Sequence, residues 1–483
     1  MLVIGIENEI KNLDKRTTND ANTAHVANLY AQGLVRANAQ LLPEADLAES
    51  FEVRDGGKTY VFRLSPEAKF HDGHPLTSED LDFNFREAMG AGSRAASSYA
   101  DVAALETPDP RTFIIRLKRP RASFLLSDVS DLKIYPKHYA GSPEFKNAPM
   151  GSGPFRFKAR RGRDLIFERN DAYRRGRLGP PESLTAFRRV VVRALQDPTT
   201  RFLSLLGGDV DLLFNALSPK RVEESVGSRY LKVYRSTGTT FQYLGLNLRL
   251  PKFQDPRVRR ALALAIDRDA IIKYKLKGMA RPASSILSAV NFYQNADLKP
   301  LPYDPAEAKR LLKAAGAENL EVEVKCSTDR DITSILLVIQ EQWERVGIRM
   351  RLRPFEFATF FSDVQKGNFE MFSLRWTSVI EPEILNRVFH SREFPPGRNR
   401  VYYQNKTVDS LLDRAAGEMN LNTRKALYSR VQALVFQDLP YIPLWYPDNI
   451  AVGTSELKGF RLSPAGYWLS FLEAHKESEF ATQ

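Results

Sequence analysis

Strand-like and helix-like segments alternate along the second half of the chain, and this alternation restricts the fold more than any other feature. Apolar strand patterns occur in LEVEVKCS (320–327), GIRMRLRPF (347–355) and FEMFSLRW (369–376). Helical patterns over 331–346 and 357–368 separate these strands. A repeated strand–helix–strand order is typical of a sheet covered by helices. We therefore predict an α/β unit in this half.

The first half of the chain predicts mixed α and β structure. Residues 47–64 read as a hairpin, because alternating apolar strands flank Asp55-Gly56-Gly57, a turn in which positive φ is expected. Thr77 is expected to cap a helix over 78–89, with Asp80 at the capping-box position. No repeat, low-complexity tract or long linker occurs in the 483 residues, so short strand crossovers are expected to join the domains.

Composition restricts the class of protein. Cys326 is the only cysteine, which rules out an intrachain disulfide and a cysteine-based metal cluster. The formal charge of +12 is scattered, and we expect no nucleic-acid partner. No run approaches the roughly 20 apolar residues of a membrane span. The first residues, MLVIGIENEI, read as a strand and not as a signal peptide, which fits either a cytoplasmic protein or one from which a signal has been removed.

Motifs of catalysis and metal binding are missing from the sequence. It contains no GxxxxGK[ST] phosphate loop, no GxSxG nucleophile motif and no HExxH metal motif. His71 and His74 flank a turn at a spacing that could chelate a metal, but no third ligand is evident nearby. We therefore expect no enzymatic activity, no catalytic residues, no cofactor and no metal.

The stretch MFSLRWTSVIEPEIL (371–385) is the candidate binding segment. Trp376 ends a predicted strand, and Thr377 and Ser378 follow it in a loop. Loops at the carboxyl ends of strands form the ligand crevice of α/β sheets, so we expect these three residues to line a pocket. Phe357, at the start of a predicted helix, is expected to line it too. The loop Thr377–Val379 has no ionisable side chain, which makes the specificity of such a pocket the open question.

Several segments, in order, resemble family 5 of the extracytoplasmic solute-binding proteins, the dipeptide-, oligopeptide- and nickel-type binding proteins of ABC importers. The resemblance runs from about residue 2 to about residue 475. The segments are LAESFEVRDGGKTYVFRLSPEAKFHDGHPLTSEDLDFNF (47–85), GSGPFRF (151–157), NDAYRRG (170–176), NLRLPKFQDPRVRRALALAIDRDAII (247–272), YDPAEAKRLLKAAG (303–316) and IQEQWERVGI (339–348).

This resemblance implies a mixed α/β periplasmic binding protein fold with three domains in two lobes, a hinge and a ligand cleft between the lobes. Mapped onto this chain, domain I comprises residues 1–42, 183–246 and 458–483. Domain II, the additional domain of the family, comprises 43–182, and domain III comprises 247–457.

The resemblance also implies a function. The protein is expected to capture a peptide or peptide-like solute and to deliver it to an ABC permease of the inner membrane. It is expected to act as a monomer, in the periplasm or lipid-anchored outside the cytoplasmic membrane. A non-peptide solute, such as an opine, a sugar, haem or a metal chelate, is the alternative. A hydrolase or a sensor domain on the same fold is less favoured.

Peptide binders of the family usually have an aspartate shortly after this tryptophan, and it pairs with the α-amino group of the peptide. In this chain the acidic position falls on Val379 or Ser378, neither of which can balance an ammonium. Glu381 matches the acidic residue of a later turn. A solute anchored through its amino group is therefore not expected.

The resemblance places four further residues in the binding site. Thr18 and Asn19 are expected in the first loop that faces the cleft, and Tyr99 is expected to contribute an aromatic ring from domain II. Phe241 lies on a crossover strand with Tyr243, and we expect only one of these two rings to face the ligand.

Overall fold

The computed structural model describes residues 1–18, 20–174, 185–215, 217–466 and 468–477. The chain forms two compact units, one of residues 1–236 with 449–483 and one of residues 237–448. It therefore passes from one unit to the other twice. Each unit has its own sheets and its own hydrophobic cores. Among the described residues, no helix combines the length and the apolar character needed to cross a membrane.

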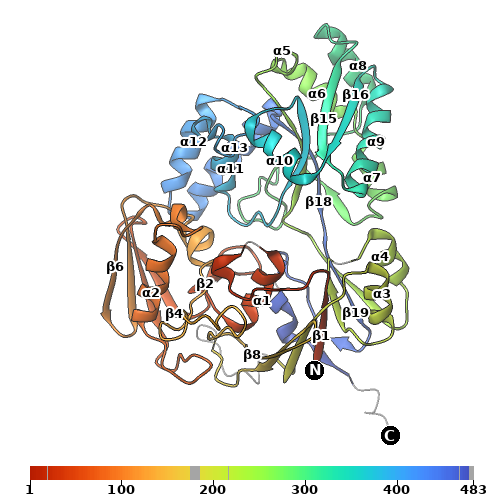
Figure 1. Cartoon of the computed structure of the whole chain (residues 1–483). Helices are drawn as coiled ribbons and strands as arrows, with labels where there is room; N and C mark the ends of the chain where they lie inside the picture. Colours follow the sequence, from red (N-terminus) through yellow and green to blue (C-terminus); the bar gives the residue numbers. More distant parts are fainter. Residues whose placement is uncertain (19, 175–184, 216, 467, 478–483) are drawn as a thin grey trace. The chain divides into compact units, whose positions relative to one another are not determined.

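The first unit is organised around a seven-stranded sheet in the order β12-β19-β11-β1-β10-β9-β8; its strands β1, β8 and β19 are labelled in Figure 1. β1 pairs in parallel with β10 and β11, and the other pairs are antiparallel. The bounds of these strands are β1 Leu2–Ile6, β8 Phe155–Arg161, β9 Asp164–Arg169, β10 Arg189–Ala194, β11 Leu212–Phe214, β12 Leu231–Ser236 and β19 Asn449–Thr454.

A four-stranded antiparallel sheet in the order β4-β5-β7-β6 forms a second core in the same unit. Its strands are β4 Ala48–Arg54, β5 Thr59–Leu64, β6 Val102–Asp109 and β7 Thr112–Leu117. Two strand pairs are shorter: β2 Val35–Ala37 with β3 Pro43–Ala45, and β20 Leu457–Lys458 with β21 His475–Lys476. The helices of this unit are α1 Ala21–Tyr30, α2 Ser78–Met89, α3 Pro198–Leu206 and α4 Pro219–Ser225.

The local predictions for the first unit are confirmed. β4 and β5 form the expected hairpin, and Asp55, Gly56 and Gly57 all have positive φ in its turn. Helix α2 begins after Thr77, whose backbone N–H donates to Asp80 Oδ2 at 3.0 Å in a reciprocal capping box. Local turn and cap chemistry was sufficient for these elements, because the partners lie within a few residues of one another.

The second unit contains a six-stranded sheet in the order β14-β18-β13-β17-β15-β16. Its strands are β13 Phe241–Leu246, β14 Ala280–Pro282, β15 Glu321–Ser327, β16 Arg349–Phe355, β17 Met371–Trp376 and β18 Tyr441–Pro447. Its helices are α5 Pro251–Gln254, α6 Pro256–Leu264, α7 Arg268–Tyr274, α8 Pro305–Ala314, α9 Arg330–Glu344, α10 Phe357–Lys366, α11 Ile384–Phe389, α12 Lys406–Gly417 and α13 Leu421–Asp438.

The predicted alternation in this unit is confirmed. β15 pairs in parallel with both β16 and β17, and α9 and α10 connect them. Gly367, at φ +74°, takes the left-handed conformation that ends α10 before the chain enters β17. Trp343 of α9 is fully buried in the core and donates its Nε1–H to the Leu262 carbonyl at 3.0 Å.

Strand pairing places three segments differently from the predicted domain ranges. β13, predicted within domain I, pairs with β17 and β18 in the sheet of the second unit. β19, predicted within domain III, pairs with β11 and β12 in the first unit. β8 and β9, predicted within domain II, extend the seven-stranded sheet through β10. The division into three domains stays a prediction.

Three of the family-like segments meet at one backbone carbonyl. Gly153 O accepts hydrogen bonds from His71 Nε2 and from Asn170 Nδ2, each at 3.0 Å. A side chain at residue 153 would not fit, because a Cβ atom there would lie 2.5 Å from the backbone carbon of Tyr30. His71, Gly153 and Asn170, one from each of these segments, thus meet in one packed junction at the end of α1.

This junction predicts a pH-dependent stability. Burial lowers the pKa of His71 to about 4, from an ordinary value of 6.5. The unfolded state then binds more protons between these values, so the free energy of unfolding should decrease as pH falls from about 6.5 to about 4. Urea unfolding at several pH values should show this slope, and His71→Gln should reduce it. The exposed control His475→Gln should leave the dependence of the unfolding free energy on pH unchanged. If His71→Gln did not reduce this dependence, it would have to come from other titratable groups.

Candidate functional site

Three adjacent strands of the six-stranded sheet bring Phe241 and Trp376 together. β13 lies between β17 and β18. In the antiparallel register of β13 and β17, Phe241 pairs with Trp376. On the other edge of β13, Gly245 pairs with Tyr441. The sheet therefore places two predicted binding residues opposite each other, although 134 positions separate 241 from 376 in the sequence.

The rings of these strands form a continuous aromatic cluster. Tyr243 stacks on Phe241, Trp376 and Tyr441, with centroid distances of 5.5, 6.4 and 4.0 Å. Residues two apart on a strand share a face of the sheet. The two rings therefore lie on one side of the sheet, so strand alternation does not separate them, and the expectation that only one of them faces the ligand stays a prediction. Their ring planes differ by 8°, and both side chains are buried.

Arg400 places a positive charge against this cluster. The centre of its guanidinium lies 5.0 Å from the centroid of Trp376 and 4.8 Å from that of Phe361, which is within the range of cation–π attraction. Arg400 is only 8% exposed. In the part of the chain that the structure describes, it forms no ion pair with a carboxylate. A buried guanidinium without a counter-ion is unfavourable, so the site has positive charge available for an anion.

Neighbouring arginines add to the positive potential. Partial burial, and then the positive charges of Arg387 and Arg400, lower the pKa of the Arg398 guanidinium, with Glu393 acting in the opposite direction. Arg387 is partly compensated by Glu383, at 3.6 Å. A surface with this balance of charge attracts anionic groups.

Polar atoms in the aromatic cluster are also short of partners. The Trp376 Nε1–H and the hydroxyls of Tyr243 and Tyr441 are buried, and none makes a hydrogen bond of normal geometry to a described residue. Burial raises the pKa of the Tyr243 hydroxyl well above its ordinary value, although Arg400 acts in the opposite direction. All three groups are hydrogen-bond donors at neutral pH. The two hydroxyls can also accept hydrogen bonds, so the charge of Arg400 is the feature that favours an anion over a cation in this region.

The loop after Trp376 has a structural reason to lack charge. Thr377 and Ser378 are exposed, and Ser378 has a left-handed backbone with φ +52°. This turn directs Val379 inward, where its side chain is buried and its N–H donates to the Thr239 carbonyl at 3.1 Å. A carboxylate at position 379 would be buried away from water, which is costly without a partner.

The next acidic residue along the chain is already neutralised. Glu381 Oε2 lies 3.1 Å from Arg424 Nη2, and the two side chains are only 11% and 3% exposed. Arg424 also donates to the Tyr293 hydroxyl at 3.0 Å. Burial alone would lower the pKa of Arg424, but Glu381 and the tyrosines raise it above its ordinary value. Glu381 therefore already has a buried counter-ion in Arg424.

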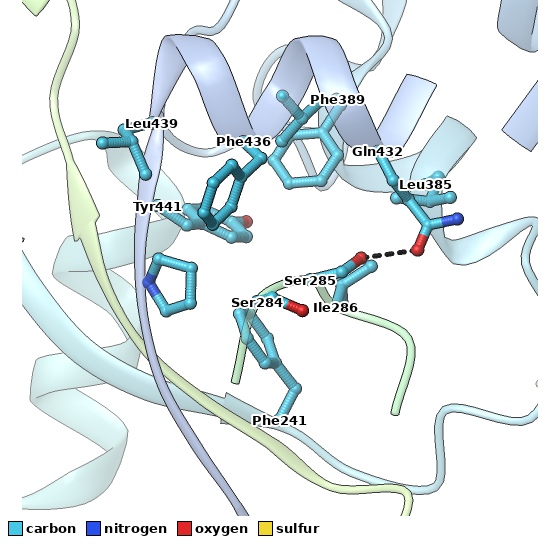
Figure 2. Close-up of a pocket in the computed structure, with 12 residues that line it drawn as sticks. Phe241, Ser284, Ser285, Ile286, Leu385, Phe389, Gln432, Phe436, Leu439 and Tyr441 are labelled. Carbon is cyan, nitrogen blue, oxygen red and sulfur yellow. Dashed lines mark hydrogen bonds between the residues drawn. The ribbon is translucent and has the colours of Figure 1, made fainter. Parts of the chain in front are cut away.

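A small, largely apolar recess lies beside the cluster (Figure 2). Phe241 and Tyr441 belong to both, and Phe389, Phe436 and Leu439 form much of the remaining wall. Its polar side chains include Ser285 and Gln432, and Ser285 Oγ donates to Gln432 Oε1 at 2.8 Å. Because these two side chains are hydrogen-bonded to each other, they do not need a polar group of a ligand. The recess therefore suits an apolar group better than a polar one.

The other predicted residues have more varied positions. Phe357 begins α10, is 55% exposed and stacks on Phe361 at 5.7 Å, which links it to Arg400. Thr18 is half-buried, and its Oγ1 accepts from the Asp20 N–H at 3.1 Å. Asn19 lies outside the described residues. Tyr99 is buried in the core of the four-stranded sheet and donates to the Asp128 carbonyl at 2.9 Å. Binding roles for all of these residues stay predictions.

Sequence reasoning missed Arg400, Phe361 and Tyr441. Arg400 follows a proline–glycine turn and has no motif around it. Tyr441 lies in an apolar strand that reads as ordinary core. The one available signal was for Phe361, which follows Phe357 by four residues and so shares its helix face.

Comparison with known proteins agrees with this architecture. The model of the bacterial extracellular solute-binding proteins, family 5, matches residues 43–391. A Brucella ovis protein provisionally named as an ABC transporter peptide-binding protein is 30% identical over 443 residues, which cover 87% of this chain and 82% of that protein. The glutathione-binding protein GsiB of Shigella boydii is 28% identical, with 96% and 92% covered.

A solved structure shows the same fold. HbpA2 from Haemophilus parasuis matches 99% of this chain and 100% of its own chain, with a TM-score of 0.88 and 24% identity. The fold is thus that of the periplasmic binding proteins, with mixed α/β structure as predicted. Because the family model covers most of its length, the chain belongs to family 5 of the bacterial extracellular solute-binding proteins.

Proposed function

We propose that this protein binds a peptide or peptide-like solute through a carboxylate of that solute and delivers it to an ABC permease. Solute binding is the role of the family, and relatives are named for peptides and for glutathione. We also propose that the protein acts in the periplasm or at a lipid anchor outside the cytoplasmic membrane, and that it releases the solute chemically unchanged.

The observation that carries the proposed specificity is Arg400. It is a buried guanidinium on the face of Trp376, with no carboxylate of the described chain paired to it. Arginine and carboxylate groups form charge-assisted, often bidentate hydrogen bonds. The Trp376 Nε1–H and the hydroxyls of Tyr243 and Tyr441 lie buried in the same cluster and could donate to a carboxylate as well. An ammonium there would be repelled by the positive charge of Arg400.

A matched set of peptides tests this proposal. Trialanine, its N-acetyl derivative, its C-terminal amide and glutathione would be titrated into ligand-stripped protein by scanning fluorimetry and calorimetry. We expect the three compounds with a free carboxylate to stabilise the protein and the amide to have little effect. A ligand at about 100 times its Kd adds about 2.7 kcal/mol to the free energy of unfolding.

The possible failures differ in meaning. Binding of the amide as tight as that of trialanine would overturn the carboxylate anchor and leave peptide binding intact. Loss of binding on N-acetylation, with the amide still bound, would show that the amino group is the anchor. No stabilisation by any of the four compounds would count against peptides as the solute class.

A further inference from the structure

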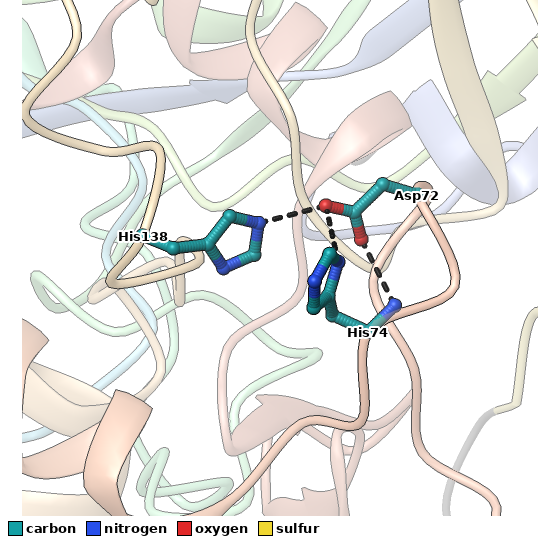
Figure 3. A group of neighbouring side chains, drawn as sticks. All are labelled: Asp72, His74 and His138. Carbon is teal, nitrogen blue, oxygen red and sulfur yellow. Dashed lines mark hydrogen bonds and ion pairs between the residues drawn. The ribbon is translucent and has the colours of Figure 1, made fainter.

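Two histidines and an aspartate meet on the surface of the first unit (Figure 3). Asp72 and His74 lie in the turn between β5 and α2, and His138 lies in a turn that follows Pro136. The sequence suggested His71 and His74 as a pair without a third ligand. The structure separates that pair, because His71 is bonded to the Gly153 carbonyl, and it brings His138 to His74 instead.

The contacts within this cluster are short and oriented. Asp72 Oδ2 lies 2.7 Å from His138 Nε2 and 2.9 Å from His74 Nδ1. The other oxygen, Oδ1, accepts the backbone N–H of His74 at 3.1 Å. One carboxylate oxygen is therefore held by the backbone while the second faces two imidazole nitrogens. The two imidazole rings are 4.4 Å apart, and Phe70 packs edge-on against His138 at 6.4 Å.

The donor set has the composition of a transition-metal site. The three ligand atoms lie within 4.8 Å of one another. Zinc binds imidazole nitrogen and carboxylate oxygen at about 2.0–2.2 Å, which in tetrahedral geometry separates two ligand atoms by roughly 3.3 Å. The observed contacts to Asp72 Oδ2 are shorter than this by roughly half an ångström, a gap that small rotations of exposed side chains can open. Neutral histidines would keep a proton on the nitrogen that faces away from the metal.

We propose that Asp72, His74 and His138 bind one divalent transition-metal ion of the zinc type, with water completing its coordination. Two imidazoles with one carboxylate suit Zn²⁺, Co²⁺ or Ni²⁺ better than Mg²⁺ or Ca²⁺, which prefer oxygen ligands. The bound ion would tie the turn at 71–75 to the turn at 136–140, two segments far apart in the sequence. This site is separate from the solute site proposed around Trp376.

Metal titration of the full chain, without a histidine tag, tests the proposal. Calorimetry with ZnCl₂ in a non-chelating buffer should show one bound equivalent, and CoCl₂ should give the visible absorption of a nitrogen- and oxygen-ligated ion. We expect His74→Gln, His138→Gln and Asp72→Asn each to weaken Zn²⁺ binding at least about tenfold. The three side chains are exposed, so these variants should fold, and circular dichroism checks that they do.

His475→Gln is the matched control, because His475 is exposed in the same unit and lies outside the cluster. It should bind Zn²⁺ as the parent protein does. If His475→Gln weakened Zn²⁺ binding as much as the three cluster variants do, the ion would be bound by scattered surface histidines, and the proposal would be overturned. Absence of a one-equivalent transition in the parent protein would also overturn it, and would leave Asp72 as a hydrogen-bonded link between two histidines.

Discussion

Replacing Glu381 with alanine is expected to lower the free energy of unfolding by about 3–5 kcal/mol, because it leaves the buried charge of Arg424 without its counter-ion. The two side chains are almost fully buried, and they lie 3.1 Å apart. The remaining partners of Arg424 are neutral: the hydroxyl of Tyr293 at 3.0 Å and the ring faces of Tyr293 and Tyr428. None of these can balance a full positive charge in a site shielded from water.

Urea unfolding followed by circular dichroism measures this loss. The control is Glu341→Ala, which removes the acidic partner of Arg345 in an exposed pair at the end of α9 in the same unit. Exposed pairs contribute little to stability, because water and salt screen them. If Glu381→Ala were no more destabilising than Glu341→Ala, the pair at 381 and 424 would be ordinary surface electrostatics, and Glu381 would again be a candidate for contact with an amino group.

The variant Arg400→Met should weaken binding of trialanine by about 10- to 150-fold, which corresponds to the roughly 1.5–3 kcal/mol of a hydrogen bond to a charged group. Methionine retains much of the length and apolar contact of the arginine stem but removes the charge. The same variant should leave the stability of the unliganded protein unchanged or increased. A buried arginine near Arg398, without a carboxylate partner, stabilises the empty protein little.

Arg375→Met is the matched control for this experiment. Arg375 precedes Trp376 on β17, and its side chain is exposed. Since neighbouring residues on a strand point to opposite faces, Arg375 does not share the face of the aromatic cluster. Its replacement should leave affinity unchanged. If both variants weakened binding equally, the effect would be one of overall charge. If Arg400→Met lost stability but kept affinity, Arg400 would be a structural residue.

The two experiments address the same question from opposite sides. In this chain the loop after Trp376 buries Val379, and the next acidic residue, Glu381, is paired with Arg424. The buried charge against Trp376 is positive, from Arg400. The missing aspartate is therefore accompanied by a cation in the same region, and this reversal of charge is the physical basis of the proposed preference for a carboxylate.

Local features of this protein were readable from the sequence wherever the interacting residues are close along the chain. The capping box of Thr77 and Asp80, the hairpin turn at Asp55 and the strand–helix alternation from β15 to β17 all depend on contacts within a few residues or on a short repeat. The ordered family-like segments indicated the fold and the solute-binding class for a related reason: several short matches in the right order rarely coincide.

Only the tertiary structure decided which distant residues share a site. Arg400 reaches Trp376 and Phe361, and His138 reaches Asp72, through folding of segments that carry no mutual signal in the sequence. The same holds for β13, which pairs with β17 and β18 of the second unit although it follows the first unit in the chain. The sequence pattern specifies the periodicity and polarity of each helix and strand. Which charged side chain lies against which aromatic ring is decided only when the sheet brings separate segments together.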